Sequence, residues 1–382
     1  MKLSRIKLFT ILTGLLLLSG CDKPSPIMPS GNTIKIGVIA PLSGSSLQKG
    51  KEGIKGIHYL LNTQPLLENG DKIELYIKDD LNKPELSTQA LNELVKKHQV
   101  TAVLSLSSSH VVLELGKIAN KYNTPIISLF ATNPGITQNN NYITPFGYND
   151  HFQGVAAALF VHDELLIERV AIFKNSNNIY SKDLADAFKN KFKSVRGQIL
   201  LDADYINNNR QLTQILSEMR NKKVQLIYLP IDANQVINIV NVLNKLNWQP
   251  KTMGADGLLV NILIDHKKDI NKLNGMITTD FYSSDLPMTE FGSVVKQGYE
   301  SKDNDLTSYS MMGIESISLL KQLLNQCSKK LKNKCIQEQL NAGVTYTGLL
   351  GKISINSDRT TQRVLLVNEI NNGELNNIVQ IY

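Results

Sequence analysis

Polar side chains follow several apolar stretches of this chain. The stretch LSLSSSHVVLEL ends an apolar run in Ser107, Ser108 and Ser109 and then continues as an apolar pattern compatible with a helix. One serine is enough to cap a helix, and we assign that role to Ser109. Because the first turn of a helix has unpaired N–H groups and a partial positive charge, Ser107 and the N–H groups behind it are expected to accept an anion.

Three further polar loops suit the opposite charge or a second contact. Thr132 lies in SLFATNPG, Tyr180 in FKNSNNIYS and Asp256 in MGADGL. Hydroxyls and helix N–H groups would hold an anion and Asp256 a cation, so the set predicts a zwitterion about the size of an amino acid. Each residue also has a structural explanation: Thr132 and Asp256 as turn formers, Tyr180 as a surface aromatic, and the serines as simple helix caps.

The elements that carry these loops alternate between apolar strands and amphipathic helices from residue 34 onward. The stretch NNNYITPFGYNDHFQG interrupts the alternation, and a second series of the same type follows it. This pattern predicts two α/β lobes, each a doubly wound parallel sheet with helices on both faces. Ligands bind beyond the carboxyl ends of such strands, which is where the polar loops lie.

The chain is predicted to pass between the two lobes three times. We expect an N-terminal lobe of residues 34–147 and 282–347, and a C-terminal lobe of 148–281 and 348–382. The three hinge crossings are predicted near residues 147–151, 278–282 and 347–352.

The first twenty residues have the layout of a secretory signal peptide. MKLSRIK is cationic, LFTILTGLLLL is apolar but short for a bilayer span, and LSGC follows at once. This arrangement predicts cleavage before Cys21 and a lipid on its thiol, with residues 21–33 as a tether. Asp22 is similar to the signal that retains enteric lipoproteins at the inner membrane. The alternative is an ordinary signal peptide with a chance cysteine.

Charge and cysteine content exclude other classes. Loss of the signal peptide lowers the formal charge of the 382-residue chain from +7 to +4, and no basic patch with interleaved aromatics indicates nucleic-acid binding. Cys327 and Cys335 lie in CSKKLKNKC. In an exported protein this spacing favours a disulfide that closes a short loop, with two free thiols as the alternative.

No motif indicates catalysis or a cofactor. GSSLQKGKE resembles a phosphate-binding loop, but its glycines are one residue too far apart and its lysine precedes Glu52 instead of a hydroxyl residue. The six histidines show no H-x-x-x-H spacing, so no metal site is predicted. No G-x-S-x-G motif is present. We therefore predict a binding protein and not an enzyme.

The chain resembles the branched-chain-amino-acid-type periplasmic binding proteins, which are the extracytoplasmic subunits of ABC importers. The resemblance extends from Ile34 to the end of the chain and rests on an ordered set of motifs. These motifs are IKIGVIAPLSG, GKEGIKG, SSSH, ISLFATNPGIT, NDHFQG and MGADGL.

In that family, the serine after the third strand and the threonine of the AT pair bind the ligand's carboxylate and amine. The resemblance thus implies ligand contacts for Ser107, with Ser108 beside it, and for Thr132, and a backbone carbonyl contact from Phe130. Two departures in this lobe affect specificity. Pro145 replaces an arginine that is frequent before the first crossover, and Phe130 is larger than the small residue of leucine-type members.

On the second lobe, the resemblance implies that Tyr180 closes over the ligand and that Asp256 receives its ammonium group. Asp232 stands where an aromatic residue often follows the IYLPI strand. An acid there would favour a polar or cationic ligand, whereas the alternative is a solvated residue at the rim.

The leading hypothesis is a lipid-anchored receptor on the periplasmic side of the cell envelope that passes an amino-acid-like molecule to ABC permease subunits. The alternative from another class is a scaffold of the same fold that docks an envelope partner such as a peptidoglycan synthase. A receptor that feeds a membrane sensor would have the same pocket and a different partner.

Overall fold

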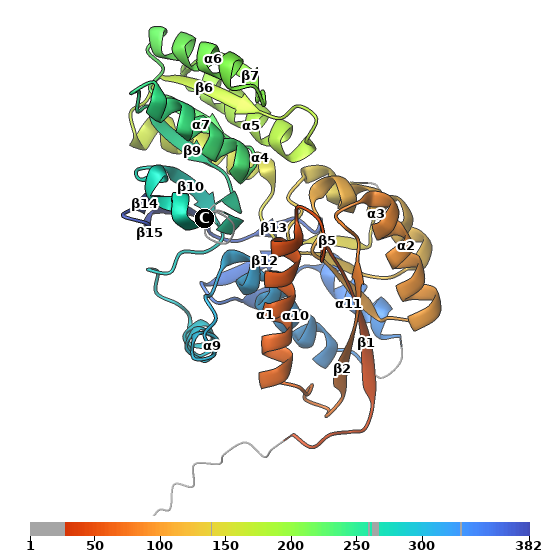
Figure 1. The fold of residues 1–382 in the computed structure, drawn as a ribbon. Coiled ribbons are helices and arrows are strands. Elements are labelled where there is room, and N and C mark those ends of the chain that lie inside the picture. Colours follow the sequence, from red (N-terminus) through yellow and green to blue (C-terminus); the bar gives the residue numbers. More distant parts are fainter. Residues whose placement is uncertain (1–26, 139, 259, 262–266, 329–330) are drawn as a thin grey trace, which may run out of the picture.

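The protein consists of two α/β lobes joined by a hinge, which confirms the predicted fold class (Figure 1). The computed structural model describes residues 27–138, 140–258, 260–261, 267–328 and 331–382. The predicted signal peptide 1–20, Cys21 and the first half of the tether lie outside these residues, so those assignments stay predictions.

The N-terminal lobe contains a five-stranded sheet in the order β2-β1-β3-β4-β5. Every neighbouring pair is parallel. β1 and β3 are almost entirely buried, as expected for strands covered on both faces. The strands are β1 (Thr33–Ala40), β2 (Lys72–Asp79), β3 (Ala102–Ser105), β4 (Ile126–Ser128) and β5 (Ile143–Pro145).

Helices cover both faces of this sheet. Ile39, Leu91 and Val112 belong to the core between the sheet and the helices α2 and α3, whereas Ile57 and Ile314 belong to the core on the α1 and α10 side. The helices are α1 (Leu47–Thr63), α2 (Pro84–Glu93), α3 (Ser109–Tyr122), α9 (Glu290–Glu300), α10 (Ser308–Asn325) and α11 (Lys332–Ala342).

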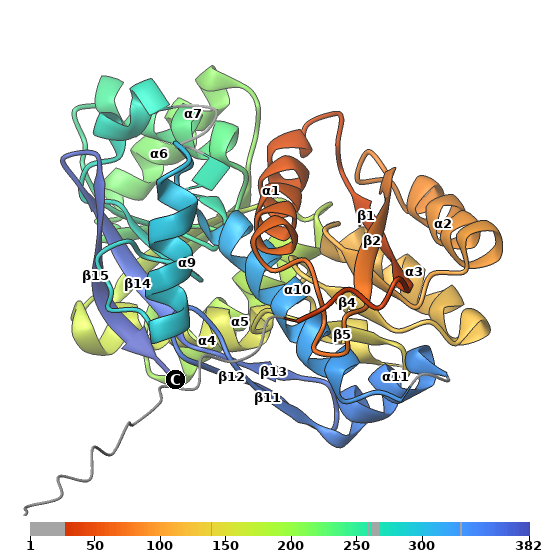
Figure 2. The same ribbon diagram turned by 90° about the horizontal axis from the view of Figure 1, so that it is seen from below.

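Helices α1 and α10 lie side by side although they are far apart in the sequence (Figures 1 and 2). Glycines permit this approach. A Cβ atom at Gly56 of α1 would collide with the carbonyl oxygen of Ser310, and one at Gly313 of α10 would collide with that of Gly53. The close packing therefore brings residues near the start of both helices, Lys49 and Tyr309, to one side of the same pocket.

The C-terminal lobe contains a seven-stranded sheet in the order β15-β14-β10-β9-β8-β6-β7. Strands β6 to β10 pair in parallel, and β14 and β15 add antiparallel strands at one edge. The strands are β6 (Arg169–Lys174), β7 (Gln198–Asp204), β8 (Leu226–Leu229), β9 (Lys251–Gly254), β10 (Ile277–Asp280), β14 (Leu365–Asn371) and β15 (Glu374–Ile381). The helices of this lobe are α4 (Asp150–Leu159), α5 (Ile179–Ser194), α6 (Asn209–Asn221) and α7 (Ala233–Lys245).

The third crossing lies later in the chain than predicted, because a small antiparallel sheet precedes it. β12 (Lys352–Ile355) pairs with β11 (Val344–Thr347) and with β13 (Thr361–Gln362). The chain enters the second sheet only at β14, so it crosses between 362 and 365, later than the predicted 347–352. The first crossing lies between β5 and α4, and the second lies after β10. Both are close to their predicted positions. The local pattern did not reveal the later crossing because β12 pairs back onto β11 before the chain leaves.

A buried ion pair ties the crossings together. The Nη2 atom of Arg363 lies 2.9 Å from Oε2 of Glu315 on α10, and both side chains are at most 2% exposed. The guanidinium carbon of Arg363 lies 5.5 Å from the ring centroid of Phe146 and 5.2 Å from that of Phe281. Arg363 thus connects the third crossing to the two phenylalanines of the first and second crossings.

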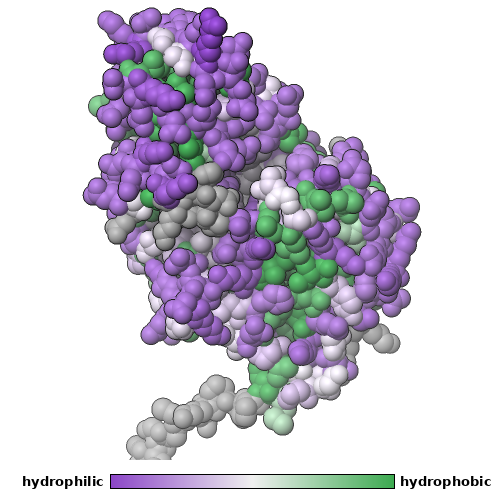
Figure 3. All heavy atoms as spheres, viewed as in Figure 1, coloured by the Kyte–Doolittle hydropathy of each residue, from purple (hydrophilic) through white to green (hydrophobic). Residues whose placement is uncertain are grey.

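The face of the molecule in Figure 3 is mostly hydrophilic, and its apolar residues gather on the N-terminal lobe. Within the described ranges, no helix has the length and apolar character needed to cross a membrane. Cys327 and Cys335 are joined by a disulfide, which links the end of α10 to α11.

Candidate functional site

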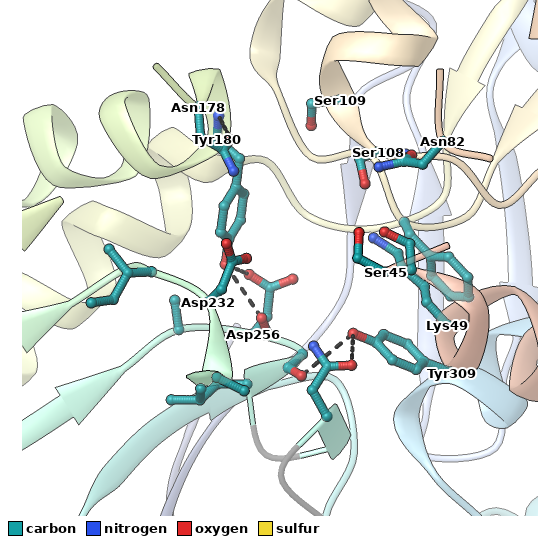
Figure 4. Close-up of a pocket in the computed structure, with 18 of the residues that line it drawn as sticks. Ser45, Lys49, Asn82, Ser108, Ser109, Asn178, Tyr180, Asp232, Asp256 and Tyr309 are labelled. Atoms are coloured by element: carbon teal, nitrogen blue, oxygen red, sulfur yellow. Dashed lines mark hydrogen bonds between the residues drawn. The ribbon is translucent and has the colours of Figure 1, made fainter. Parts of the chain in front are cut away.

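A cavity of about 280 Å³ lies between the two lobes (Figure 4). This volume is close to the lower end of the range of roughly 300–1,000 Å³ for small-molecule sites. Its walls consist of Ser45, Ser46, Lys49, Asn82, Ser108, Ser109, His110, Phe130, Asn178, Tyr180, Ile231, Asp232, Ala233, Ala255, Asp256, Gly257, Leu258, Asn261, Phe281, Tyr309 and Met312. We call this cavity the cleft.

Sheet order explains why these loops meet. In the N-terminal sheet the chain passes from β1 to β2 on one side and then to β3 on the other, so β1 and β3 form a topological switch point. In the C-terminal sheet the corresponding strands are β6 and β8. Connections at a switch point leave in opposite directions and open a crevice beyond the carboxyl ends of the strands. The cleft lies where the two crevices face each other.

The N-terminal wall is rich in hydrogen-bond donors. Ser108 is the N-cap residue of α3, and its own N–H donates to Oδ1 of Asn82 at 2.9 Å. The N–H groups of Ser109 and His110, in the first turn of α3, make no hydrogen bond to any residue that the structure describes. The positive end of the α3 helix dipole therefore adjoins the cleft and suits an anion.

The C-terminal wall carries two carboxylates, Asp232 and Asp256. The hydroxyl of Tyr180 donates to Oδ1 of Asp256 at 2.7 Å, and Nε2 of Gln153 donates to the same oxygen at 2.6 Å. Burial raises the pKa of Asp256, whereas the Tyr180 hydrogen bond and the charge of Lys49 oppose this rise. Figure 4 shows Asp232 and Asp256 next to each other and facing the open part of the cleft. This wall therefore suits a cation.

Lys49 adds a positive charge to the N-terminal wall. Its Nζ lies 5.0 Å from the ring centroid of Phe130 and 5.9 Å from that of Tyr309, and these two rings pack against each other. Burial lowers the pKa of Lys49 to about 8, while the charges of the acids, led by Asp256 and Asp232, oppose that effect. The ammonium group forms no ion pair within 4.0 Å among the described residues.

Five of the seven ligand contacts predicted from the sequence line the cleft, namely Ser108, Phe130, Tyr180, Asp232 and Asp256. Ser107 and Thr132 do not. Ser107 is fully buried, and its hydroxyl donates to Oδ2 of Asp80 at 2.5 Å. Asp80 is a buried carboxylate just beyond β2 that needs donors, and Ser87 supplies another at 2.6 Å. The placement of Ser107 at the cleft was therefore wrong.

The predicted roles of Ser109 and Thr132 also change. Ser109 does not cap α3 but is its first residue, and its Oγ accepts the N–H groups of Thr132 at 3.2 Å and Asn133 at 3.3 Å. Thr132 is 2% exposed and lies behind this contact, with its carbonyl accepting the N–H of Asp150. Ser109 therefore holds the loop after β4 against α3, and Thr132 belongs to that support.

Replacing Ser107 by alanine is expected to destabilise the protein by about 1–3 kcal/mol, because the buried carboxylate of Asp80 loses a donor. Urea unfolding at pH 7 measures this change. The matched control is Ser108→Ala, which removes the same hydroxyl from a partly exposed position where it makes no hydrogen bond to the described residues. Equal loss of stability in the two variants would contradict the buried role of Ser107.

Sequence reasoning missed several lining residues. Lys49 lies in GSSLQKGKE, a stretch that we discarded as a chance match to a phosphate-binding loop. Asn82 lies three residues after the end of β2, so the rule that ligands bind beyond the carboxyl ends of strands would have found it. Tyr309 had no such signal, because α10 reaches the cleft only through its packing on α1. In the described part of the chain, no cluster of three or more metal-ligating side chains occurs.

Comparison with known proteins identifies the family. A family model described as periplasmic binding protein matches residues 33–374. The structure is similar to a leucine-binding protein from Thermotoga maritima MSB8, with a TM-score of 0.82, 22% identity, and coverage of 91% of this chain and 98% of that protein. It is also similar to the branched-chain amino acid transporter substrate-binding protein LivJ from Streptococcus pneumoniae, solved with isoleucine, with a TM-score of 0.80, 22% identity, and coverage of 91% and 100%.

A third similar structure is a solute-binding protein of an ABC transporter from Rhodopseudomonas palustris BisB5, solved with 3,4-dihydroxybenzoic acid. Its TM-score is 0.78, its identity is 19%, and the match covers 91% of this chain and 97% of that protein. Identities this low establish a common fold and leave the ligand open, as the different ligands of these structures illustrate. The family match over most of the chain and the two-lobed fold together show that this chain belongs to the periplasmic binding protein family and has its type I fold.

Proposed function

We propose that the protein is an extracytoplasmic solute-binding protein that captures an amino acid or a similar small polar molecule and delivers it to an ABC importer. The observation that carries this proposal is the opposite polarity of the two cleft walls. Donors at the start of α3 lie on one wall, and the carboxylate of Asp256 lies on the other. A zwitterion of amino-acid size complements both.

The proposed ligand pose follows from these contacts. The ligand carboxylate accepts hydrogen bonds from the Ser108 hydroxyl and from the N–H groups of Ser109 and His110. The ligand ammonium donates to Asp256, whose Oδ1 is already fixed by Tyr180 and Gln153. Fixed partners reduce the cost of orienting the carboxylate when the ligand binds.

The proposed mechanism is closure of the lobes about the three crossings. A ligand that contacts both walls stabilises the closed arrangement over the open one by its differential affinity for the two states. Asn133 of the N-terminal lobe donates to Oδ2 of Asp183 on α5 at 2.6 Å, so the lobes already touch beside the hinge. Closure would bring the wall with Ser108 toward Asp256.

Two further observations support delivery to an importer. Two of the similar structures are an amino acid transporter substrate-binding protein and a solute-binding protein of an ABC transporter. The N-terminal sequence has the signal-peptide layout, with Cys21 as the proposed lipidated residue, Asp22 favouring the inner membrane, and residues 21–33 as the tether. A lipid anchor would keep the receptor near its permease.

A thermal-shift panel tests the capture of a solute. Purified protein is heated with each of the twenty amino acids, related amides and hydroxylated benzoic acids. A true ligand at about 100 times its dissociation constant is expected to add about 2.7 kcal/mol to the free energy of unfolding, because it binds only the folded state. Calorimetric titration of each hit then gives its affinity.

The panel has a decisive negative outcome. If no small molecule raises the melting temperature and calorimetry detects no binding, capture of a solute is contradicted. Recovery of a peptidoglycan synthase instead of permease subunits from crosslinked membranes would then favour the scaffold hypothesis. Recovery of a permease with a bound amino acid supports the proposal as stated.

A further inference from the structure

Among the side chains that line the cleft, one lysine and two aspartates face one another across open space. Lys49 lies on the N-terminal wall, and Asp232 and Asp256 lie on the C-terminal wall (Figure 4). Lys49 forms no ion pair within 4.0 Å with either aspartate in the described part of the chain. The two walls therefore carry one positive and two negative charges that a guest must satisfy.

The two acids are held in place by different partners. Asp256 follows β9 and is bound by Tyr180 and Gln153. Asp232 follows the neighbouring strand β8 and starts α7 as its N-cap, in a capping box with Gln235. Neighbouring strands are about 5 Å apart, so a short ligand can reach both carboxylates. Asp232 therefore adds a second anionic position beside Asp256.

When the lobes close, each charged side chain of the cleft needs a ligand group of opposite charge. A neutral amino acid places one ammonium group on the C-terminal wall, so either Asp232 or Asp256 is left without a cationic partner. Enclosing an unpaired carboxylate costs much more than enclosing a paired one. A guest with one carboxylate and two cationic groups pairs all three wall charges.

We propose that Lys49 and Asp232 select the ligand by its charge, and that the ligand is a basic amino acid with one carboxylate and two cationic groups. This inference rests on the proposed function. Lys49 and the start of α3 take the carboxylate, Asp256 takes the α-ammonium group, and Asp232 takes the cationic group of the side chain.

Calorimetry with ornithine, lysine, arginine, leucine, glutamine and glutamate tests the proposal. The wild-type protein is expected to bind at least one basic amino acid about 30-fold more tightly than leucine or glutamine. Asp232→Asn is expected to weaken that binding by about 30-fold, the lower end of the cost of breaking an enclosed charge pair, and to change leucine binding little. Because asparagine is as good an N-cap as aspartate, α7 and the melting temperature should be unaffected.

Lys49 provides an independent readout. Burial lowers the pKa of Lys49 to about 8 in the ligand-free protein. The ligand carboxylate beside Lys49 is expected to raise this pKa, so the protein takes up a fraction of a proton when it binds the ligand at pH 8. The groups whose charges act on Lys49 are Asp256, Asp232, Asp150 and Asp80. Titrations in buffers of different ionisation enthalpy measure the uptake, which Lys49→Met should remove. An unchanged proton uptake in Lys49→Met would contradict its contact with the carboxylate.

The outcomes separate this inference from the proposed function. If leucine or glutamine binds as tightly as any basic amino acid, the charge inference is overturned while amino-acid capture stands. If Asp232→Asn and Lys49→Met weaken the binding of all amino acids equally, and if their effects are not additive, the two residues form an ion pair across the closed cleft. They then do not discriminate between ligands by charge. If no amino acid binds the wild-type protein, the proposed function itself fails.

Discussion

Asp256→Asn is expected to weaken amino-acid binding by about 2–5 kcal/mol, which corresponds to roughly 30- to 4,000-fold in the dissociation constant. Asparagine retains an oxygen that can accept from Tyr180 and Gln153, so the geometry of the wall is preserved. Only the negative charge opposite the ligand ammonium is lost. Calorimetric titration of the best ligand from the thermal-shift panel measures the effect.

The stability of the ligand-free protein should change in the opposite direction. The folded pKa of Asp256 is raised by burial, so the folded state binds more protons than the unfolded state above the usual carboxyl pKa. This carboxylate therefore lowers stability as pH rises through that range, and its loss should leave the melting temperature at pH 7 equal or higher. A lower melting temperature together with weaker binding would indicate a structural role for Asp256.

Glu168→Gln is the matched control for this substitution. Glu168 is exposed, belongs to the same lobe, and precedes β6 at the opposite edge of the sheet from the cleft. The Glu168→Gln substitution removes the same charge at a position that does not contact the proposed ligand. Similar losses of affinity in Glu168→Gln and Asp256→Asn would mean that overall lobe charge acts on the ligand, and not a direct contact with Asp256.

Arg363→Met is expected to have the largest effect on stability, about 3–5 kcal/mol. The substitution leaves the carboxylate of Glu315 in the core with the N–H of Leu349, at 2.6 Å from Oε1, as its remaining hydrogen-bond donor. It also removes the cation that lies between Phe146 and Phe281. Denaturant unfolding measures the loss, and a lower slope would reveal that the two lobes unfold separately.

Two controls define the cause. Lys334→Met breaks an ion pair with Glu338 whose side chains are 68% and 67% exposed, and a change below about 0.5 kcal/mol is expected there. The double variant Glu315→Met/Arg363→Met removes the unpaired charge and should recover much of the lost stability. If the double variant is as unstable as Arg363→Met alone, packing at the crossings and not the buried charge explains the effect.

The alternation of strands and helices was readable from the sequence because it depends on local periodicity. Apolar runs such as TIKIGVIA and VTAVLSL suffice to indicate buried parallel strands. In parallel sheets the carboxyl ends of neighbouring strands share one edge, so the polar residues after them were expected to meet. This reasoning placed Tyr180 and Asp256 at the cleft correctly, but it also placed Ser107 and Thr132 there. Ser108 and Asp232 were expected at the cleft only from the family resemblance.

Which serine of the SSSH stretch faces the cleft was beyond local reasoning. Ser107 turns inward because Asp80, 27 residues earlier, is buried and accepts its hydroxyl. The third crossing was misplaced for a similar reason, since the pairing of β12 with β11 and β13 decides where the chain leaves the N-terminal lobe. Both outcomes depend on partners outside the local pattern.

The sequence by itself determined two doubly wound lobes and the loops that follow their strands, because helix and strand periods are properties of neighbouring residues. It also supplied the predicted anchor at Cys21, which depends on a linear motif. Only the tertiary structure placed Lys49 and Tyr309 in the cleft, through the close packing of α1 on α10. The charge pattern of the cleft arises between residues as far apart in the sequence as Lys49 and Asp256, and only the folded chain brings them together.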